Sequence, residues 1–458
     1  MNAQKANYTD CRGEQQPKVV TSPKEKVRQL QRKLYRSAKQ NRKRKYHALY
    51  DKIYRMDILQ EAWKRIRASK GSGGIDNMTI ADIESYGVNE FLSEIAQTLK
   101  GGKYRPLPTK RVYIPKGDGK ERPLGLPTIK DKIVQTATKL VIEPIFEADF
   151  KDNSYGFRPK RSQHMALEAV RKACNNKGNW VVDADIKAYF DHINHKKLMI
   201  LLEERICDRR VLKLIRQWLE AGVMVNNVYE STNEGSPQGG VISPLLSNIY
   251  LNYLDRVWEK HGSHLGILVR FADDCVIICK TRDIARAALK LLREIMKRLE
   301  LELNDEKTKL IQLRPGKAGF DFLGFHHRKE KRIARNGWTY TSTIQFPSKK
   351  AMKRMKTAVK DLLGNRSHLK NDIQDMIDQM NLKIRGWRNY YGLFTAQKWL
   401  SSIDWHILQW FTRWWNKKRN RQMHLSKISL ILKMLKAKGL KRLSFQRKRA
   451  KKGCRKAV

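Results

Sequence analysis

The stretch from Ile267 to Cys279 constrains the fold of this chain more than any other. Two apolar runs, Ile267-Leu-Val-Arg-Phe271 and Cys275-Val-Ile-Ile-Cys279, flank the short break Ala272-Asp273-Asp274. Such runs around a tight polar break are typical of a β-hairpin. Two adjacent carboxylates beside an apolar sheet are costly unless a cation neutralises them, and carboxylate oxygens suit Mg²⁺. An ordinary turn, in which Asp is common, is the competing interpretation.

A second short apolar segment also carries carboxylates. It is Trp180-Val-Val-Asp-Ala-Asp-Ile186, and strand alternation places Asp183 and Asp185 on one of its faces. The competing interpretation is a strand end with a capping Asp. A strand carboxylate beside a turn pair can hold two metal ions, which activate an attacking hydroxyl and stabilise a leaving phosphate.

The charge of the chain indicates what it binds. It has 95 Lys and Arg against 45 Asp and Glu, a net charge of +50. A surface this positive attracts polyanions, of which nucleic acid is the obvious one. A packing protein or a ribosomal protein would satisfy the charge equally well, so charge indicates a partner and no chemistry.

Cysteine usage and hydropathy bear on the compartment. The six cysteines form no paired CxxC clusters, which favours a reduced intracellular environment over a zinc or disulfide framework. No apolar run approaches the roughly 18 residues that a membrane helix needs, and the N-terminus lacks the apolar region of a secretory signal. We expect a soluble, cytoplasmic protein without membrane contact; an organellar location stays open.

Mixed helices and strands without regular alternation predict an α+β fold. We expect a helix from about Ser22 to Ala68, a break at Gly71–Gly74 and a new helix start at Asp76 to Thr79. From Tyr104 to Gln135 we expect a hairpin with its turn at 116–120, followed by a helix, and a long helix should cover about 282–299. The last third is helical, and from Ser401 onward 18 Lys and Arg face the single acidic residue Asp404.

An ordered series of blocks makes the interpretation specific. They are Tyr155-Gly-Phe-Arg-Pro159, Asp185-Ile-Lys-Ala-Tyr-Phe-Asp191, Gly235-Ser-Pro-Gln-Gly-Gly-Val-Ile-Ser-Pro244, Phe271-Ala-Asp-Asp274, Leu303-Asn-Asp-Glu-Lys-Thr-Lys309 and Phe320-Asp-Phe-Leu-Gly-Phe325. The series resembles the motif set of group II intron-encoded reverse transcriptases and maturases, over roughly residues 55 to 400. That family usually has Tyr where this chain has Phe271, which leaves the carboxylates unchanged.

The resemblance implies a right-hand polymerase with fingers, palm and thumb, followed by a mostly helical maturase (X) domain. We divide the chain into a basic helical N-terminal extension (1–70), fingers and palm (71–345), thumb and maturase domain (346–400) and a basic helical nucleic-acid-binding segment (401–458). Many relatives append a His-Asn-His endonuclease, and we expect none here.

Catalytic roles follow by motif match. The resemblance implies that Asp185 and Asp273 bridge two Mg²⁺ ions, for which Mn²⁺ could substitute, with Asp274 a supporting ligand. Asp183 is a weaker candidate for ligation, and Asp191 is expected to cap the following helix. Lys307 resembles a lysine that protonates departing pyrophosphate, although a plain surface lysine fits nearly as well.

Substrate-binding roles follow in the same way. Arg122 resembles the family's triphosphate-binding arginine, with Lys116 as a second cation, although either could be a surface charge. Phe190 matches the gate that excludes a 2′-hydroxyl, with Tyr189 as the competing residue and core packing as the competing role. Gln238 and Gly239 match the block that contacts nucleotide or template.

Two further groups concern the nucleic acids. Phe322, Leu323 and Gly324 match the region that supports the primer terminus, although core packing explains the aromatic residue equally well. Arg385-Gly-Trp-Arg-Asn-Tyr-Tyr-Gly392 resembles the maturase signature, in which Arg385, Trp387, Arg388, Tyr390 and Tyr391 would contact RNA. For each single aromatic residue, core packing is the favoured alternative.

The sequence therefore predicts an RNA-directed DNA polymerase of group II intron type that also assists splicing. Its expected partners are intron RNA as template and splicing partner, a DNA primer or target, and dNTPs; a homodimer is left open. The alternatives are a splicing-only RNA-binding maturase, which would not need Asp185, Asp273 and Asp274, and a free-standing defence-type reverse transcriptase.

Overall fold

The structure is a computed structural model that describes residues 22–115, 121–225, 228–230, 235, 239–316, 319–334, 336–420 and 428–445. Lys116 and Gln238 lie outside the described residues. The chain divides into two compact units, the first of Met1–Phe150 with Phe190–Tyr250 and the second of Lys151–Tyr189 with Leu251–Val458. Mixed helices and sheets confirm the α+β prediction, whereas the four-part division of the chain stays a prediction.

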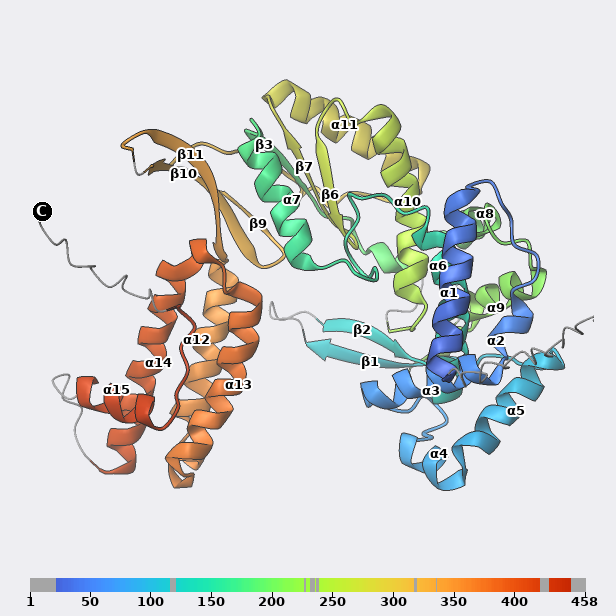
Figure 1. Cartoon of the computed structure of the whole chain (residues 1–458), viewed down its shortest axis with the longest axis horizontal. Coiled ribbons are helices and arrows are strands. Elements are labelled where there is room, and N and C mark those ends of the chain that lie inside the picture. Colours follow the sequence, from blue (N-terminus) through green and yellow to red (C-terminus); the bar gives the residue numbers. More distant parts are fainter. Residues whose placement is uncertain are drawn as a thin grey trace, which may run out of the picture. The chain divides into compact units, whose positions relative to one another are not determined.

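The first unit is mainly helical with one small sheet. Its elements are α1 (Pro23–Gln40), α2 (Tyr50–Ile53), α3 (Met56–Ser69), α4 (Ile80–Tyr86), α5 (Val88–Lys100), β1 (Thr109–Pro115), β2 (Glu121–Leu126), α6 (Ile129–Glu147), α8 (His195–Glu203), α9 (Arg209–Glu220), β4 (Val223–Val225) and β5 (Val228–Glu230). The strand order is β2-β1-β4-β5. Helix α6, buried along most of its length, is the centre against which α1 and α3 pack (Figure 1).

The N-terminal region is three helices where we predicted one. Helix α1 begins after the cap Ser22, as predicted, but ends at Gln40. The following segment is held in an extended form by distant residues: the Tyr46 amide donates to the Arg205 carbonyl over 2.9 Å. The amides of Leu49 and Tyr50 donate to the Asp208 carboxylate over 2.9 and 2.8 Å. These tertiary hydrogen bonds satisfy the backbone between α1 and α2 and at the first residue of α2, and they override the local pattern.

Two further predictions in this unit are confirmed and one is wrong. Strands β1 and β2 pair antiparallel from Lys110 with Leu126 to Pro115 with Glu121, which confirms the predicted hairpin. Thr79 caps α4 through a reciprocal pair of hydrogen bonds with Asp82, which confirms that helix start. The cap of α8 is Asn194, so the prediction that Asp191 caps it is wrong. Asp191 instead ends a short 3₁₀ turn.

The second unit contains a four-stranded sheet of order β6-β7-β3-β8 and a three-stranded sheet of order β11-β10-β9. Its elements are α7 (Gln163–Asn175), β3 (Trp180–Ala184), β6 (Ile267–Phe271), β7 (Asp274–Cys279), α11 (Arg282–Arg298), β8 (Lys309–Gln312), β9 (Phe320–Phe322), β10 (Phe325–Ile333) and β11 (Thr339–Pro347). Helices α7 and α11 pack against the four-stranded sheet. Helix α10 (Ser243–His261) and the turn η1 (Tyr189–Asp191) each begin in one unit and end in the other.

The rest of the second unit is helical. Helices α12 (Lys349–Gly364), α13 (Ile373–Tyr391) and α14 (Gln397–Lys418) form a bundle that α15 (Ile428–Ala437) joins, with short turns η2 (Arg366–Lys370) and η3 (Phe394–Ala396) between them (Figure 1). Helix α14 runs through the boundary that we predicted at residue 400. No described helix is long and apolar enough to cross a membrane.

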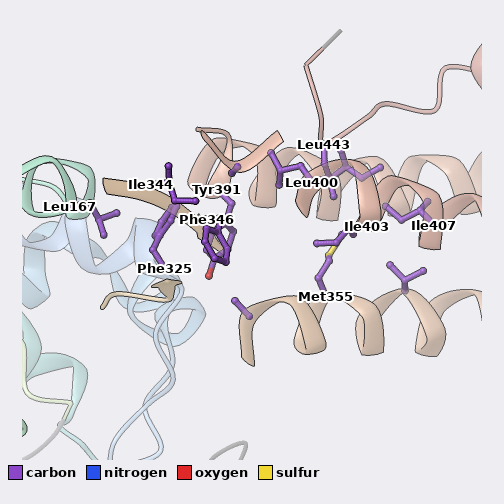
Figure 2. Close-up of a cluster of buried hydrophobic side chains, with 14 of the residues drawn as sticks. Leu167, Phe325, Ile344, Phe346, Met355, Tyr391, Leu400, Ile403, Ile407 and Leu443 are labelled. Atoms are coloured by element: carbon purple, nitrogen blue, oxygen red, sulfur yellow. The ribbon is translucent and has the colours of Figure 1, made fainter. Parts of the chain in front are cut away.

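One hydrophobic core joins the strands of this unit to its helices. Figure 2 shows Leu167, Phe325, Ile344 and Phe346 next to Tyr391 and, further along, residues of the bundle such as Met355 and Ile403. The Phe346 ring stacks on Trp399 with a centroid separation of 3.6 Å. The buried residues of the strands and of the helices belong to one contiguous cluster, so the bundle and the sheets share a hydrophobic core.

Candidate active site

The predicted acidic hairpin is present and its turn is strained. Phe271 pairs with Asp274, which leaves Ala272 and Asp273 as the two turn residues between β6 and β7. Ala272 has a φ of +57°, a left-handed conformation that costs a residue with a side chain about 1–3 kcal/mol. Strand β3 pairs with β7 from Trp180–Cys279 to Ala184–Cys275, so the second carboxylate segment ends beside this turn.

The carboxylates of the two segments influence one another. Burial, followed by the charges of Asp274, Asp185 and Asp321, raises the pKa of Asp183 to about 7. Removal from water and the neighbouring Asp273 and Asp185 carboxylates raise the pKa of Asp274 to about 6. The structure thus brings Asp185, Asp273 and Asp274 into one electrostatic cluster, and it adds Asp183, which we had ranked lower.

Lys307 lies at the same cluster. Its Nζ is 2.9 Å from Asp185 Oδ2, and the Asn304 amide donates to the Asp185 carbonyl over 2.8 Å. An isolated bridge between Ile186 and Leu303 continues β3 beyond its last strand residue. The loop that carries Lys307 is therefore tied to the segment that carries Asp185, and the lysine contacts a predicted metal ligand. Its role in proton transfer stays a prediction.

The carboxylates of this cluster fit a hard divalent cation. All of its ligating atoms are carboxylate oxygens, and the raised pKa values record repulsion that a cation would relieve. Within the described ranges, however, no three His, Cys, Asp or Glu side chains converge closely enough to hold an ion as they stand. Because the Lys307 ammonium pairs with Asp185, a cation at that oxygen would have to compete with it.

The raised pKa of Asp183 predicts how stability depends on pH. The unfolded residue loses its proton near pH 3.8, whereas the folded one keeps it to about 7. Between these values the folded state binds more protons than the unfolded state, so stability falls as pH rises. We expect Asp183→Asn to flatten the fall between about pH 4 and 7 in urea titrations without divalent cations. Asp305→Asn, at an exposed carboxylate, is the control; equal pH profiles for wild type and Asp183→Asn would refute the expectation.

A buried ion pair that we did not predict supports the turn. The fully buried Arg270 donates through Nε to both oxygens of Asp255 over 3.0 and 3.2 Å, and through Nη2 to Asp255 Oδ2. Its Nη1 donates to the carbonyl of the turn residue Ala272 over 2.9 Å. Asn153 Nδ2 donates to Asp255 Oδ1 over 2.8 Å. The visible signal was a charged residue inside an apolar strand, but no pattern in the sequence indicated its partner.

The Tyr155–Pro159 block also contacts the turn between β6 and β7. The Tyr155 amide donates to the Arg270 carbonyl over 2.9 Å, and Gly156 packs directly against the backbone of the turn. A Cβ at position 156 would lie 2.9 Å from the Phe271 carbonyl carbon and 3.0 Å from Ala272 Cα, and still closer to the Ala272 nitrogen. Only glycine allows this close approach of two backbones.

Gly156→Ala should therefore displace the turn. A shift of about 1 Å in reacting groups can cost about a hundredfold in rate, and we expect a loss of that order in nucleotidyl transfer. Gly386→Ala is the matched control, because no atom lies within 4 Å of a Cβ built there. Rates of primer extension at equal folded protein concentration measure the effect. A Gly156→Ala rate as high as that of Gly386→Ala would exclude this role.

In the first unit, the loop at Gly239 contacts β2, the strand that carries Arg122. Gly239 has a φ of +118°, and a Cβ there would lie 2.5 Å from the carbonyl oxygen of Gly125 on β2. The side chain of Gln135 on α6 accepts from the Val241 amide over 2.9 Å, so it holds the same loop. Arg122 has an exposed side chain on β2 and pairs with Ile114 of β1. Gln135 is a residue that sequence reasoning missed.

Phe190 belongs to the same unit and is buried, as is its competitor Tyr189. A Cβ at Gly235 would lie 2.9 Å from the carbonyl oxygens of both Phe190 and Asp191. His195 Nε2 contacts the Gly235 carbonyl over 2.6 Å. The start of the Gly235 block therefore rests on the backbone that carries Phe190, and the gate role of that ring stays a prediction.

The predicted primer-supporting residues form a tight turn between β9 and β10. Leu323 and Gly324 have φ values of +48° and +76°, and the flanking Phe322 is buried. Tyr390 donates its hydroxyl to the Leu323 carbonyl over 2.8 Å, and a Cβ at Gly324 would lie 2.8 Å from the Tyr391 hydroxyl. The maturase-like signature therefore braces this turn.

This placement bears on the five predicted RNA contacts. Tyr391 is buried in the core, where it packs against Trp387 with a centroid separation of 4.3 Å, so core packing accounts for its ring. Arg385 and Arg388 are exposed on α13, and Arg388 lies 4.6 Å from the centre of the Phe445 ring. RNA contact by this group stays a prediction, and the two arginines are its most accessible members.

Comparison with known proteins gives two family matches. Residues 114–327 match the model described as reverse transcriptase (RNA-dependent DNA polymerase). Residues 352–429 match the model described as the maturase-specific domain of group II introns. The first match contains all four carboxylates of the cluster and Lys307, and the second contains α13 and α14.

The chain is also similar to individual proteins and solved structures. The chain is 35% identical over 364 residues to Protein YkfC of Escherichia coli, covering 71% of this chain and 93% of that protein. It is 38% identical over 226 residues to the group II intron-encoded protein LtrA of Lactococcus lactis, covering 49% of this chain but only 37% of LtrA. Among solved structures, a Candida albicans telomerase matches at 14% identity and a TM-score of 0.39, covering 76% of this chain and 65% of that one.

Proposed function

Because the chain belongs to the family of group II intron-encoded reverse transcriptases and maturases, we propose that it copies RNA into DNA at the Asp185, Asp273 and Asp274 carboxylates. The observation that carries the proposal is the mutual repulsion of these carboxylates beside a strained turn that a buried ion pair supports. A structural hairpin turn would need neither the charge repulsion nor the support.

Each part of the chain has a proposed role. Asp185, Asp273 and Asp274 would hold two Mg²⁺ ions, which when bound supply charge neutralisation and a more acidic primer hydroxyl. Lys307, which contacts Asp185, would exchange this contact for one with departing pyrophosphate. Arg122 and the backbone of the Gly239 loop would bind the dNTP phosphates and base, and Phe190 would exclude ribonucleotides. The Leu323–Gly324 turn would support the primer terminus.

The RNA partner is proposed on different grounds. The match of residues 352–429 to the maturase-specific domain, together with the positive charge of the last third, supports binding of a group II intron RNA as template and splicing partner. We also propose that the chain assists splicing. Because the chain spans only 37% of LtrA, no other property of that protein is carried over.

The test of the polymerase is extension of a DNA primer annealed to an RNA template, with Mg²⁺ or Mn²⁺ and four dNTPs. Wild-type protein should extend the primer, and should discriminate against rNTPs less when Phe190 is replaced by Val. If the wild-type chain extends no primer on RNA, the proposed function fails. Splicing of a group II intron by an Asp274→Asn variant would show that the RNA-binding role is separate from polymerisation.

A further inference from the structure

A groove between α12 and α14 lies apart from the residues discussed above. Its volume is about 410 Å³, within the range of roughly 300–1,000 Å³ typical of sites for small ligands. Its lining includes Lys349, Lys353, Lys356 and Lys360 from α12, with His406 and Trp410 from α14. None of the five predicted RNA-contacting residues lines it.

The four lysines form a row along one face of α12. Their spacing of four, three and four residues places them on successive turns of the helix, and all four are exposed. Within the described ranges no acidic side chain forms an ion pair with any of them. Like charges at this spacing repel one another, so an anionic ligand would stabilise the row.

An aromatic ring adjoins this row. Trp410 is half-buried, and its ring centre lies 6.3 Å from that of His406 at an interplanar angle of 66°. Arg413 lies 5.1 Å from the ring centroid on α14, and a Cβ at Gly364 would lie 3.1 Å from a ring carbon. These neighbours hold the indole in place. A fixed aromatic ring beside a cationic row is the arrangement on which single-stranded nucleic acids stack their bases.

His406 is the remaining polar group of the floor. His406 Nε2 is enclosed by protein atoms and forms no hydrogen bond within the described part of the chain. Burial lowers the pKa of this ring, against a hydrogen bond with the Lys356 backbone that raises it, and the charges of Lys356 and Arg413 add to the lowering. The His406 ring lies beside Trp410 in the lining of the groove, so a base that stacks on the indole would also pack against it.

We infer that this groove binds one unpaired nucleotide of a single-stranded nucleic acid, with its base beside Trp410 and His406 and the flanking phosphates along the four lysines. The inference rests on the proposed function, in which the chain handles a nucleic-acid template. An acidic peptide or a lipid surface would use the lysines but would leave the aromatic floor without a role. A continuous duplex would keep its bases stacked and out of the groove.

Salt dependence tests the lysine row. Affinity of the full chain for an unstructured single-stranded RNA is measured by fluorescence anisotropy over a range of KCl concentrations. Lys353→Ala with Lys356→Ala should lower the log–log salt slope by about 1.4, since each phosphate contact on a single strand contributes about 0.7. Lys290→Ala with Lys297→Ala, two exposed lysines of α11, is the charge-matched control and should leave the slope unchanged. Equal slopes for the two double variants would overturn the inference.

A nucleic-acid strand without bases tests the base pocket. Wild-type protein should bind an RNA with bases about tenfold or more tightly than an abasic strand of the same length. Trp410→Ala should lose most of this difference, whereas Trp410→Phe, which keeps a ring, should retain most of it. A Trp410→Ala variant that discriminates as well as wild type would contradict the pocket. Polyglutamate or phosphatidylserine vesicles that compete for the protein as well as RNA does would also contradict the pocket. Binding of a single-stranded DNA shows whether the sugar matters.

Failure of this inference is distinguishable from failure of the proposed function, because the binding assays contain no dNTPs. A chain that extends primers without Trp410-dependent discrimination would overturn the groove site alone. A chain that discriminates between strands with and without bases but extends no primer would overturn the polymerase alone.

Discussion

Arg270→Met should lower the free energy of unfolding by about 3–5 kcal/mol, the usual cost of removing one partner of a buried ion pair. The substitution would leave Asp255 buried without its guanidinium and the Ala272 carbonyl without its donor. Urea unfolding followed by circular dichroism measures the loss. The turn that carries Asp273 should also loosen, so nucleotidyl transfer should fall even at temperatures where the variant stays folded.

Two comparisons identify the cause of that loss. Arg293→Met removes an ion pair of similar length, 2.7 Å to Asp305, but on the surface, and should cost less than about 1 kcal/mol. Arg270→Met combined with Asp255→Leu should recover part of the stability, because no buried charge is then left without a partner. If Arg270→Met and Arg293→Met were equally mild, the buried pair would have no structural role.

The sequence predicted the parts of the site that depend on local pattern. Alternation and β-branched residues were enough to locate β3, β6 and β7, and a turn with two carboxylates could be recognised between the last two. Ser22 and Thr79 were recognisable as helix starts because a cap acts on residues two or three positions ahead.

What the sequence could not show depends on contacts between distant residues. Asp255 and Arg270 lie on different elements, α10 and β6, and neither has a motif, so only the fold reveals that they pair. The single helix predicted over 22–68 failed because Asp208, far along the chain, captures the amides of Leu49 and Tyr50. Neither interaction leaves a local pattern in the sequence.

The maturase-like signature shows the same limitation. Its tyrosines were candidates for RNA stacking, but Tyr390 donates to the Leu323 carbonyl and Tyr391 packs in the core. A run of aromatic and basic residues is compatible with either role until burial is known. The lysine row of α12 was equally visible in the sequence, but it became interpretable only when α14 placed Trp410 and His406 beside it.

Asp273→Asn should have the largest effect on activity. The substitution keeps the size of the side chain and the turn but removes one negative charge from the cluster that would hold the divalent cations. A loss of about 4 kcal/mol in stabilisation of the transition state corresponds to roughly a thousandfold in rate. Because the carboxylates repel one another, the variant should be at least as stable as wild type, which excludes unfolding as the cause.

The most direct measurement is the rate of single-nucleotide addition to a DNA primer on an RNA template, for wild type and Asp273→Asn under identical conditions. Binding of the primer–template hybrid is measured in the same samples. We expect a rate about a thousandfold lower in the variant, with binding within a factor of about three. An Asp273→Asn variant that adds nucleotides within tenfold of the wild-type rate would contradict the assignment of this turn as the catalytic centre.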